Sequence, residues 1–147
     1  SGAASKRLRT NVAEFLRLLV VAASERDLVV EREGQEVPSL TTWLMGACAA
    51  IASNETKARQ LRHTGTFIAL RLVDAMLDCR AGAAKALANA NKQLDAGKKK
   101  GSKGAALKSL EDEAARAALL RDTLGQSATA IFDTIAVERY RDFSEAV

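Results

Sequence analysis

The sequence predicts an all-α fold organised around a long antiparallel helical hairpin. Ala recurs in clusters near residues 47–50, 81–86 and 114–118, and the 147 residues contain a single Pro. Abundant Ala with almost no Pro is typical of long helices. The turn signals and alternating runs of a β-sandwich are absent, and the Val-rich run Leu28–Val30 is too short for the strands of an α/β domain. The length suits one domain.

A first helix is predicted from about Lys6, where apolar residues begin to recur at steps of three and four. The stripe comprises Val12, Phe15, Leu16, Leu19, Val20 and Ala23. Residues 1–5 lack such a pattern and are expected to be flexible, and Ser1–Gly2 is consistent with a cloning scar. The acidic stretch Glu31–Glu36 contains Gly34 and is predicted to be a loop.

A second helix is predicted over Leu40–Ala52. Ser39 can cap its N-terminus, and a Pro such as Pro38 is tolerated in a first turn. Because this segment is apolar on nearly all sides, we expect a core helix packed between neighbours. Trp43 should then be buried, and its replacement by Ala should cost about 3–5 kcal/mol.

Residues 97–104 form the plainest loop, with three Gly and four Lys. Before this loop, a helix is predicted from a capped turn at Ser53–Glu55 to about Asp95. After the loop, apolar residues recur three and four apart for about four heptads, as in a coiled-coil seam. We expect these helices to form an antiparallel hairpin over residues 66–136, each about 45 Å long at 1.5 Å per residue. Another helix should begin near Val137. The facing stripes are Phe67, Leu70, Val73, Leu77, Ala84, Leu87 and Leu94, and Leu107, Leu110, Ala114, Ala117, Leu124, Ala128, Ile131 and Ile135.

Residues that could support catalysis are scarce, so no enzyme, cofactor or metal site is predicted. His63 is the only His and has no Cys or His at ligand spacing. The glycines around Lys98 do not match a phosphate-binding loop, and no strand precedes them. Cys48 and Cys79 are interpreted as free thiols of an intracellular protein. No segment is apolar enough to span a membrane.

Positive charge is concentrated although the net charge is only +4. Residues 98–108 contain five Lys and no acid, and residues 57–71 contain four basic residues and no acid. Such clusters bind phosphate backbones without reading sequence. The alternative is that the lysines only keep a loop soluble. The candidate nucleic-acid-binding residues are Lys98, Lys99, Lys100, Lys103, Lys57, Arg59 and Arg62.

Two motifs resemble the STAG domain of the stromal-antigen subunit of cohesin. They are Arg62-His63-Thr64-Gly65-Thr66 and the closing Val137–Asp142, and Asn11–Phe15 agrees with the first helix of the family. The similarity covers most of the chain. It departs at Gly65, where the family usually has Ser, and at Ala136 and Glu138, which replace a bulkier apolar residue and a His. The Gly/Lys tip of the hairpin indicates a divergent, fungal member.

The resemblance implies a nuclear, chromatin-associated, non-enzymatic subunit with a role in sister-chromatid cohesion. Residues 6–147 would be a single STAG-like domain, a fragment at the N-terminal part of a HEAT-like α-solenoid. DNA backbone and the cohesin complex are the expected partners, with kleisin contacts outside this fragment. Two alternatives stay open: a docking module for a cohesin regulator, using the hairpin arms and a groove around Trp43, and a structural cap of the solenoid. His63 and Thr64 are expected to pack against the last helix near Tyr140.

Overall fold

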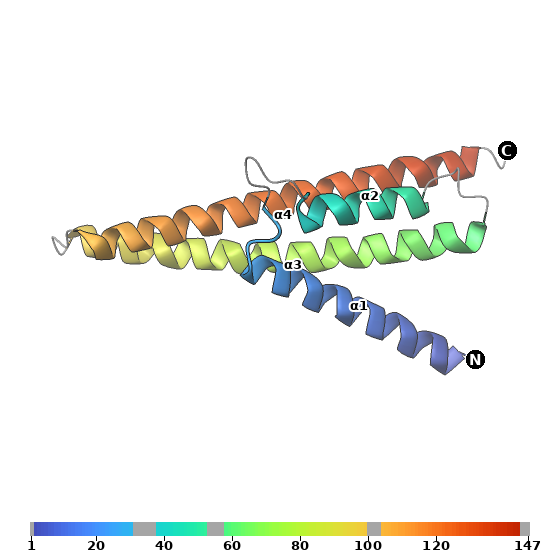
Figure 1. Ribbon diagram of the computed structural model, residues 1–147, viewed down its shortest axis with the longest axis horizontal. Coiled ribbons are helices and arrows are strands. Elements are labelled where there is room, and N and C mark those ends of the chain that lie inside the picture. Colours follow the sequence, from blue (N-terminus) through green and yellow to red (C-terminus); the bar gives the residue numbers. More distant parts are fainter. Residues whose placement is uncertain (1, 31–37, 53–57, 100–103, 145–147) are drawn as a thin grey trace.

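The computed structural model describes residues 2–30, 38–52, 58–99 and 104–144, and these fold as four helices. The helices are α1 (Gly2–Glu25), α2 (Leu40–Ala52), α3 (Arg59–Lys99) and α4 (Ala105–Ser144). α3 and α4 form a long antiparallel hairpin, α2 lies along its base and α1 crosses α3 (Figure 1). The described residues contain no strand, so the all-α prediction is confirmed. The continuation into a HEAT-like solenoid stays a prediction.

The main core lies at the base of the hairpin, where all four helices contribute side chains. Leu72, Met76 and Leu124 are fully buried there, beside Val20 of α1 and Leu44 of α2. A smaller cluster of Ala90, Leu94 and Ala114 holds the outer part of the hairpin together. The fold therefore has a thick base and a thin two-helix arm.

The α4 side of the predicted seam is confirmed, whereas the α3 side is right at Val73 and Leu94 and wrong by one residue at Leu77 and Ala84. Six of the predicted α4 residues are buried, but Leu77 of α3 is 45% exposed and Ala84 is also exposed. The buried row on α3 instead repeats every seven residues through small and flexible side chains. Three of the four members of this row are Ala, which allows α3 and α4 to approach closely, and Met76 is fully buried among them. The row is Ala69, Met76, Ala83 and Ala90.

The cap of α2 is confirmed, but its predicted burial on all sides is wrong. The Thr42 N–H donates to Ser39 Oγ at 3.3 Å, and the buried Thr41 hydroxyl donates to the Val29 carbonyl at 3.0 Å. Leu44 is buried, whereas Trp43 is 61% exposed. α2 packs on α3 and α4 through one face only, and no other described helix covers the face that carries Trp43.

Several helix boundaries also differ from the prediction. α1 begins at Gly2 rather than near Lys6, so residues 2–5 form its first turn. Phe15, placed in the inward stripe, is 63% exposed. α3 continues past Asp95 to Lys99, and α4 runs without interruption through Val137. The Ala-rich sequence carries both helices through positions where a break was expected.

Candidate nucleic-acid interface

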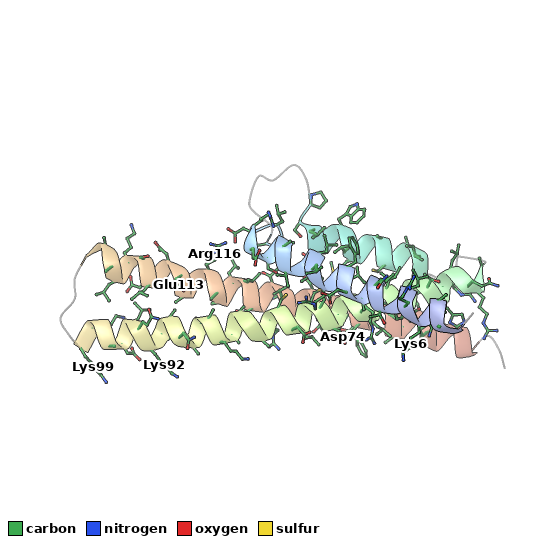
Figure 2. All side chains as sticks on the ribbon, turned by 90° about the horizontal axis from the view of Figure 1, so that it is seen from below. Lys6, Asp74, Lys92, Lys99, Glu113 and Arg116 are labelled. Atoms are coloured by element: carbon green, nitrogen blue, oxygen red, sulfur yellow. The ribbon has the colours of Figure 1, made fainter. Side chains whose placement is uncertain are left out.

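The predicted basic residues lie at opposite ends of the molecule. Arg59 begins α3 and Lys99 ends it, so these residues are about 60 Å apart at 1.5 Å per residue. Figure 2 shows Lys99 at the hairpin tip and Lys6 of α1 at the far end. The candidates therefore form two separate surfaces. Lys57, Lys100 and Lys103 fall outside the described residues, as do the predicted loop over residues 31–36 and the turn at Ser53–Glu55.

The first surface is a row of lysines that runs along the outer face of α3 toward the hairpin tip. Lys85, Lys92 and Lys99 follow one another at steps of seven residues, about 10.5 Å along the helix axis, and all three are exposed. Lys92 and Lys99 point to the same side, away from α4 (Figure 2). None of the three forms an ion pair within the described part of the chain. We call Lys85, Lys92 and Lys99 the lysine row.

Two members of the lysine row, Lys85 and Lys92, are not among the residues predicted from sequence. The predicted residues lie in dense local runs of positive charge, whereas helical residues seven apart share a face without being neighbours in sequence. The seven-residue spacing of the three lysines is the sequence signal that places them on one face of a helix. Between Arg80 and Lys99, α3 carries five basic residues and a single acid, Asp95.

Lys98 and Lys99 belong to the last turn of α3 rather than to a loop. Lys98 Nζ lies 4.0 Å from Glu111 Oε1 on α4, and both side chains are more than half exposed. Cations in a last turn also interact favourably with the helix dipole. Lys98 thus has a local acidic partner, and the facing α4 turn is acidic through Glu111–Glu113. The cationic face of the arm is the outer side of α3.

The other surface lies at the far end of the molecule, where the N-terminal half of α1 flanks the start of α3 across a groove. Arg59 Nε donates to His63 Nε2 at 3.2 Å, and the Thr64 hydroxyl donates to the Gln60 carbonyl at 2.9 Å. His63 and Thr64 are exposed and line a groove with α1, so the predicted packing role for them is wrong. The side chain of Tyr140 falls outside the described residues.

The remaining chemistry of the described residues is sparse. Cys48 is buried, Cys79 is half-buried and both are free; burial raises the pKa of both thiols. Within the described ranges, no three His, Cys, Asp or Glu side chains gather as a metal ion would require. None of the four helices has the length and apolar character needed to cross a membrane.

Comparison with protein families places most of the chain in a known domain family. The family model of the STAG domain matches residues 1–113, which include α1, α2, α3 and the first residues of α4. The Arg62–Thr66 motif lies inside the matched range, and the closing Val137–Asp142 motif lies beyond it. A comparison with curated protein sequences finds no significant match.

Proposed function

Since the chain belongs to the STAG domain family, we propose that it is a non-catalytic segment of a nuclear cohesin subunit that contacts the DNA backbone. The observation that carries this proposal is the lysine row on the outer face of α3. Three exposed ammonium groups about 10.5 Å apart on one helix face can reach phosphates about three base pairs apart, and they offer no forked or planar group for reading bases. The contact would support sister-chromatid cohesion without sequence preference.

A salt titration of duplex binding tests the lysine row. Each phosphate neutralised adds about 0.9 to the slope of log affinity against log salt, so changing Lys85, Lys92 and Lys99 to Ala should flatten it by up to about 2.7. The matched control changes the same three residues to Arg, which keeps the charge and should keep the slope. Unchanged affinity and slope in the Ala variant would contradict the proposal.

The hairpin tip needs its own variant, because only Lys99 is shared with the lysine row. Changing Lys98, Lys99, Lys100 and Lys103 to Ala should flatten the slope by up to about 3.6 if all four contact phosphates. Lys98 lies near Glu111, so we expect less than this limit. If the salt slope flattens more in this variant than in the Ala variant of the lysine row, the main DNA contact lies at the tip. Lys57, Arg59 and Arg62 are the next residues to change.

A second candidate function is a docking module for a cohesin regulator, and the exposed Trp43 favours it. Trp43 stands 61% exposed on α2, a helix without any charged residue, and Ile51 is 41% exposed. Aromatic residues are enriched where proteins bind partners. On this reading, Trp43→Ala would leave the salt titration of duplex binding unchanged and weaken regulator binding. If neither contact exists, the alternative that stays open is a structural cap of a solenoid.

A further inference from the structure

The open end of the molecule contains an apolar groove with a basic rim. α1 diverges from α3 toward its N-terminus (Figure 1), and a groove of about 360 Å³ lies between the two helices. Its apolar wall is formed by two residues from each helix, and polar residues flank them. The apolar residues are Leu8, Val12, Phe67 and Ile68, and the polar ones are Ser5, Arg9, His63 and Thr64. We call this the α1–α3 groove.

The apolar wall is accessible and partly fixed in place. Leu8 is 65% exposed, although it faces a groove in which Phe67 and Ile68 are half-buried. The guanidinium of Arg71 lies over the Phe67 ring, 5.9 Å from its centroid, and Arg71 is held in turn by Asp74 at 3.1 Å. The ring therefore has a cation on one side and the groove beside it.

The charge around the groove has one sign. Residues 2–13 of α1 and 59–73 of α3 carry six basic residues between them and no acid. Arg9 lines the groove, and Arg59 reaches its edge through the hydrogen bond to His63. Because His63 Nε2 accepts that bond, Nδ1 carries the ring proton and is the atom that can donate to a ligand. The rim thus offers cations and donors to an acidic ligand.

We propose that the α1–α3 groove binds an acidic protein segment that inserts a bulky apolar side chain. The apolar wall favours a peptide over a duplex backbone, which brings phosphates but no apolar side chain to bury. Charge complementarity selects the acidic segment, and burial of Leu8 and Phe67 beneath an inserted Leu or Phe supplies the anchor. This site is independent of the lysine row, which lies at the other end of α3.

The probe for this site is a fluorescein-labelled peptide of about 12 residues, mostly Asp and Glu, with Leu and Phe one helical turn apart. Fluorescence anisotropy is measured with the full chain against this peptide and against a peptide in which both anchors are Ser. We expect the anchored peptide to bind about tenfold more tightly, the factor that corresponds to about 1.4 kcal/mol. Equal binding of both peptides, or binding of neither, would overturn the proposal.

Two matched pairs of variants assign the binding to the groove. Leu8→Ser should weaken binding of the anchored peptide about five- to tenfold. Leu18→Ser changes another Leu of α1 that is more than half exposed but lies outside the groove, and it should not weaken binding. Arg9→Gln should weaken it more than Arg7→Gln, because only Arg9 lines the groove. If each control weakens binding as much as its partner, the peptide is held by general charge and the site is wrong.

Nucleic acid is the alternative ligand for the groove, and its affinity for the Leu8→Ser variant distinguishes it from a peptide. A single-stranded thymidine oligomer can stack bases on an aromatic ring such as Phe67. We expect neither this oligomer nor a duplex to lose affinity when Leu8 becomes Ser. If Leu8→Ser loses oligomer binding, and the peptides with and without the Leu and Phe anchors bind equally well, the groove is a nucleic-acid site. The Ala variant of the lysine row should keep peptide affinity, so failure of either proposal leaves the other testable.

Discussion

Arg116 of α4 donates through Nε to the carboxylate of Asp27 at 2.9 Å and joins positions 89 residues apart. Asp27 follows the end of α1 and has φ 57°, a left-handed conformation that often ends a helix. Arg116 Nη2 also reaches the Glu25 carbonyl at 3.4 Å. A cation beside the last carbonyls of a helix is favourable. This pair therefore fixes the end of α1 against the arm of the hairpin (Figure 2).

A double-mutant cycle should detect this coupling. Arg116→Ala and Asp27→Asn each remove one charge, and Asn tolerates the left-handed backbone. Both side chains are more than a third exposed, so we expect a coupling energy of about 0.2–1 kcal/mol in urea unfolding. This coupling energy should fall as salt is added, because salt screens exposed charges. The Arg121→Ala variant, which removes a pair with the adjacent Asp122, is the control and should show no coupling to Asp27.

Trp43 and Leu44 are neighbours on α2 with opposite environments, and their truncations should differ. Leu44 is 8% exposed and belongs to the main core, so Leu44→Ala should cost about 2–5 kcal/mol. Trp43→Ala, in contrast with the value expected from sequence, should cost less than about 1 kcal/mol because little area is buried. Urea unfolding measures both. A larger loss for Trp43 than for Leu44 would show that the indole is packed.

Hydropathy periodicity predicted the helices better than it predicted their faces. The seam of α4 was readable because Leu124, Ile131 and Ile135 are large apolar residues at helical spacing and are all buried. On α3 the predicted stripe passes through Leu77 and Ala84, whereas the buried row passes through Met76 and Ala83, one residue earlier, and two Leu or Met residues side by side give hydropathy no means of choosing between them. The exposure of Trp43 depends on which helices cover α2, and an apolar segment does not encode its neighbours.

The candidate site was predictable in composition and not in arrangement. Dense lysines marked the hairpin tip, but Lys85 and Lys92 joined Lys99 only once α3 was known to be one continuous helix. Nor could the sequence separate Arg59 from Lys99 in space, because the 60 Å between them follows from an unbroken helix. The α1–α3 groove depends on the angle at which α1 leaves α3, which no local pattern specifies.

Two glycines should respond in opposite directions to replacement by Ala. Gly82 lies inside α3, and a Cβ there meets nothing within 4 Å. Gly82→Ala should therefore stabilise the fold by about 0.5–1 kcal/mol through helix propensity. Gly104 has φ 91° at the start of α4, so Gly104→Ala should destabilise by about 1 kcal/mol or more. Thermal unfolding compares them, and a loss of stability in Gly82→Ala would indicate an unseen contact on α3.

The two thiols should react slowly and in order. Burial raises the pKa of Cys48 and of Cys79, so at about pH 8 each holds less thiolate than an ordinary cysteine. Cys79 is the less buried, and a disulfide reagent should modify it before Cys48. Cys79→Ser should remove the faster phase. A raised pKa in the folded state contributes stability below the unfolded thiol's pKa and loses it as pH rises through the folded value, so alkaline solutions should weaken the fold.

Duplex length separates the lysine row from the open end of the molecule. From Lys85 to Lys99 the row spans about 21 Å, or about 6 base pairs at 3.4 Å per pair, whereas Arg59 to Lys99 spans about 18 base pairs. If the row alone contacts DNA, duplexes of about 10 and 24 base pairs should give the same salt slope once the number of binding positions is corrected for. Arg59→Gln should then leave both slopes unchanged. A steeper slope with the longer duplex, lost in Arg59→Gln, would show that DNA reaches the open end and competes with a peptide in the α1–α3 groove.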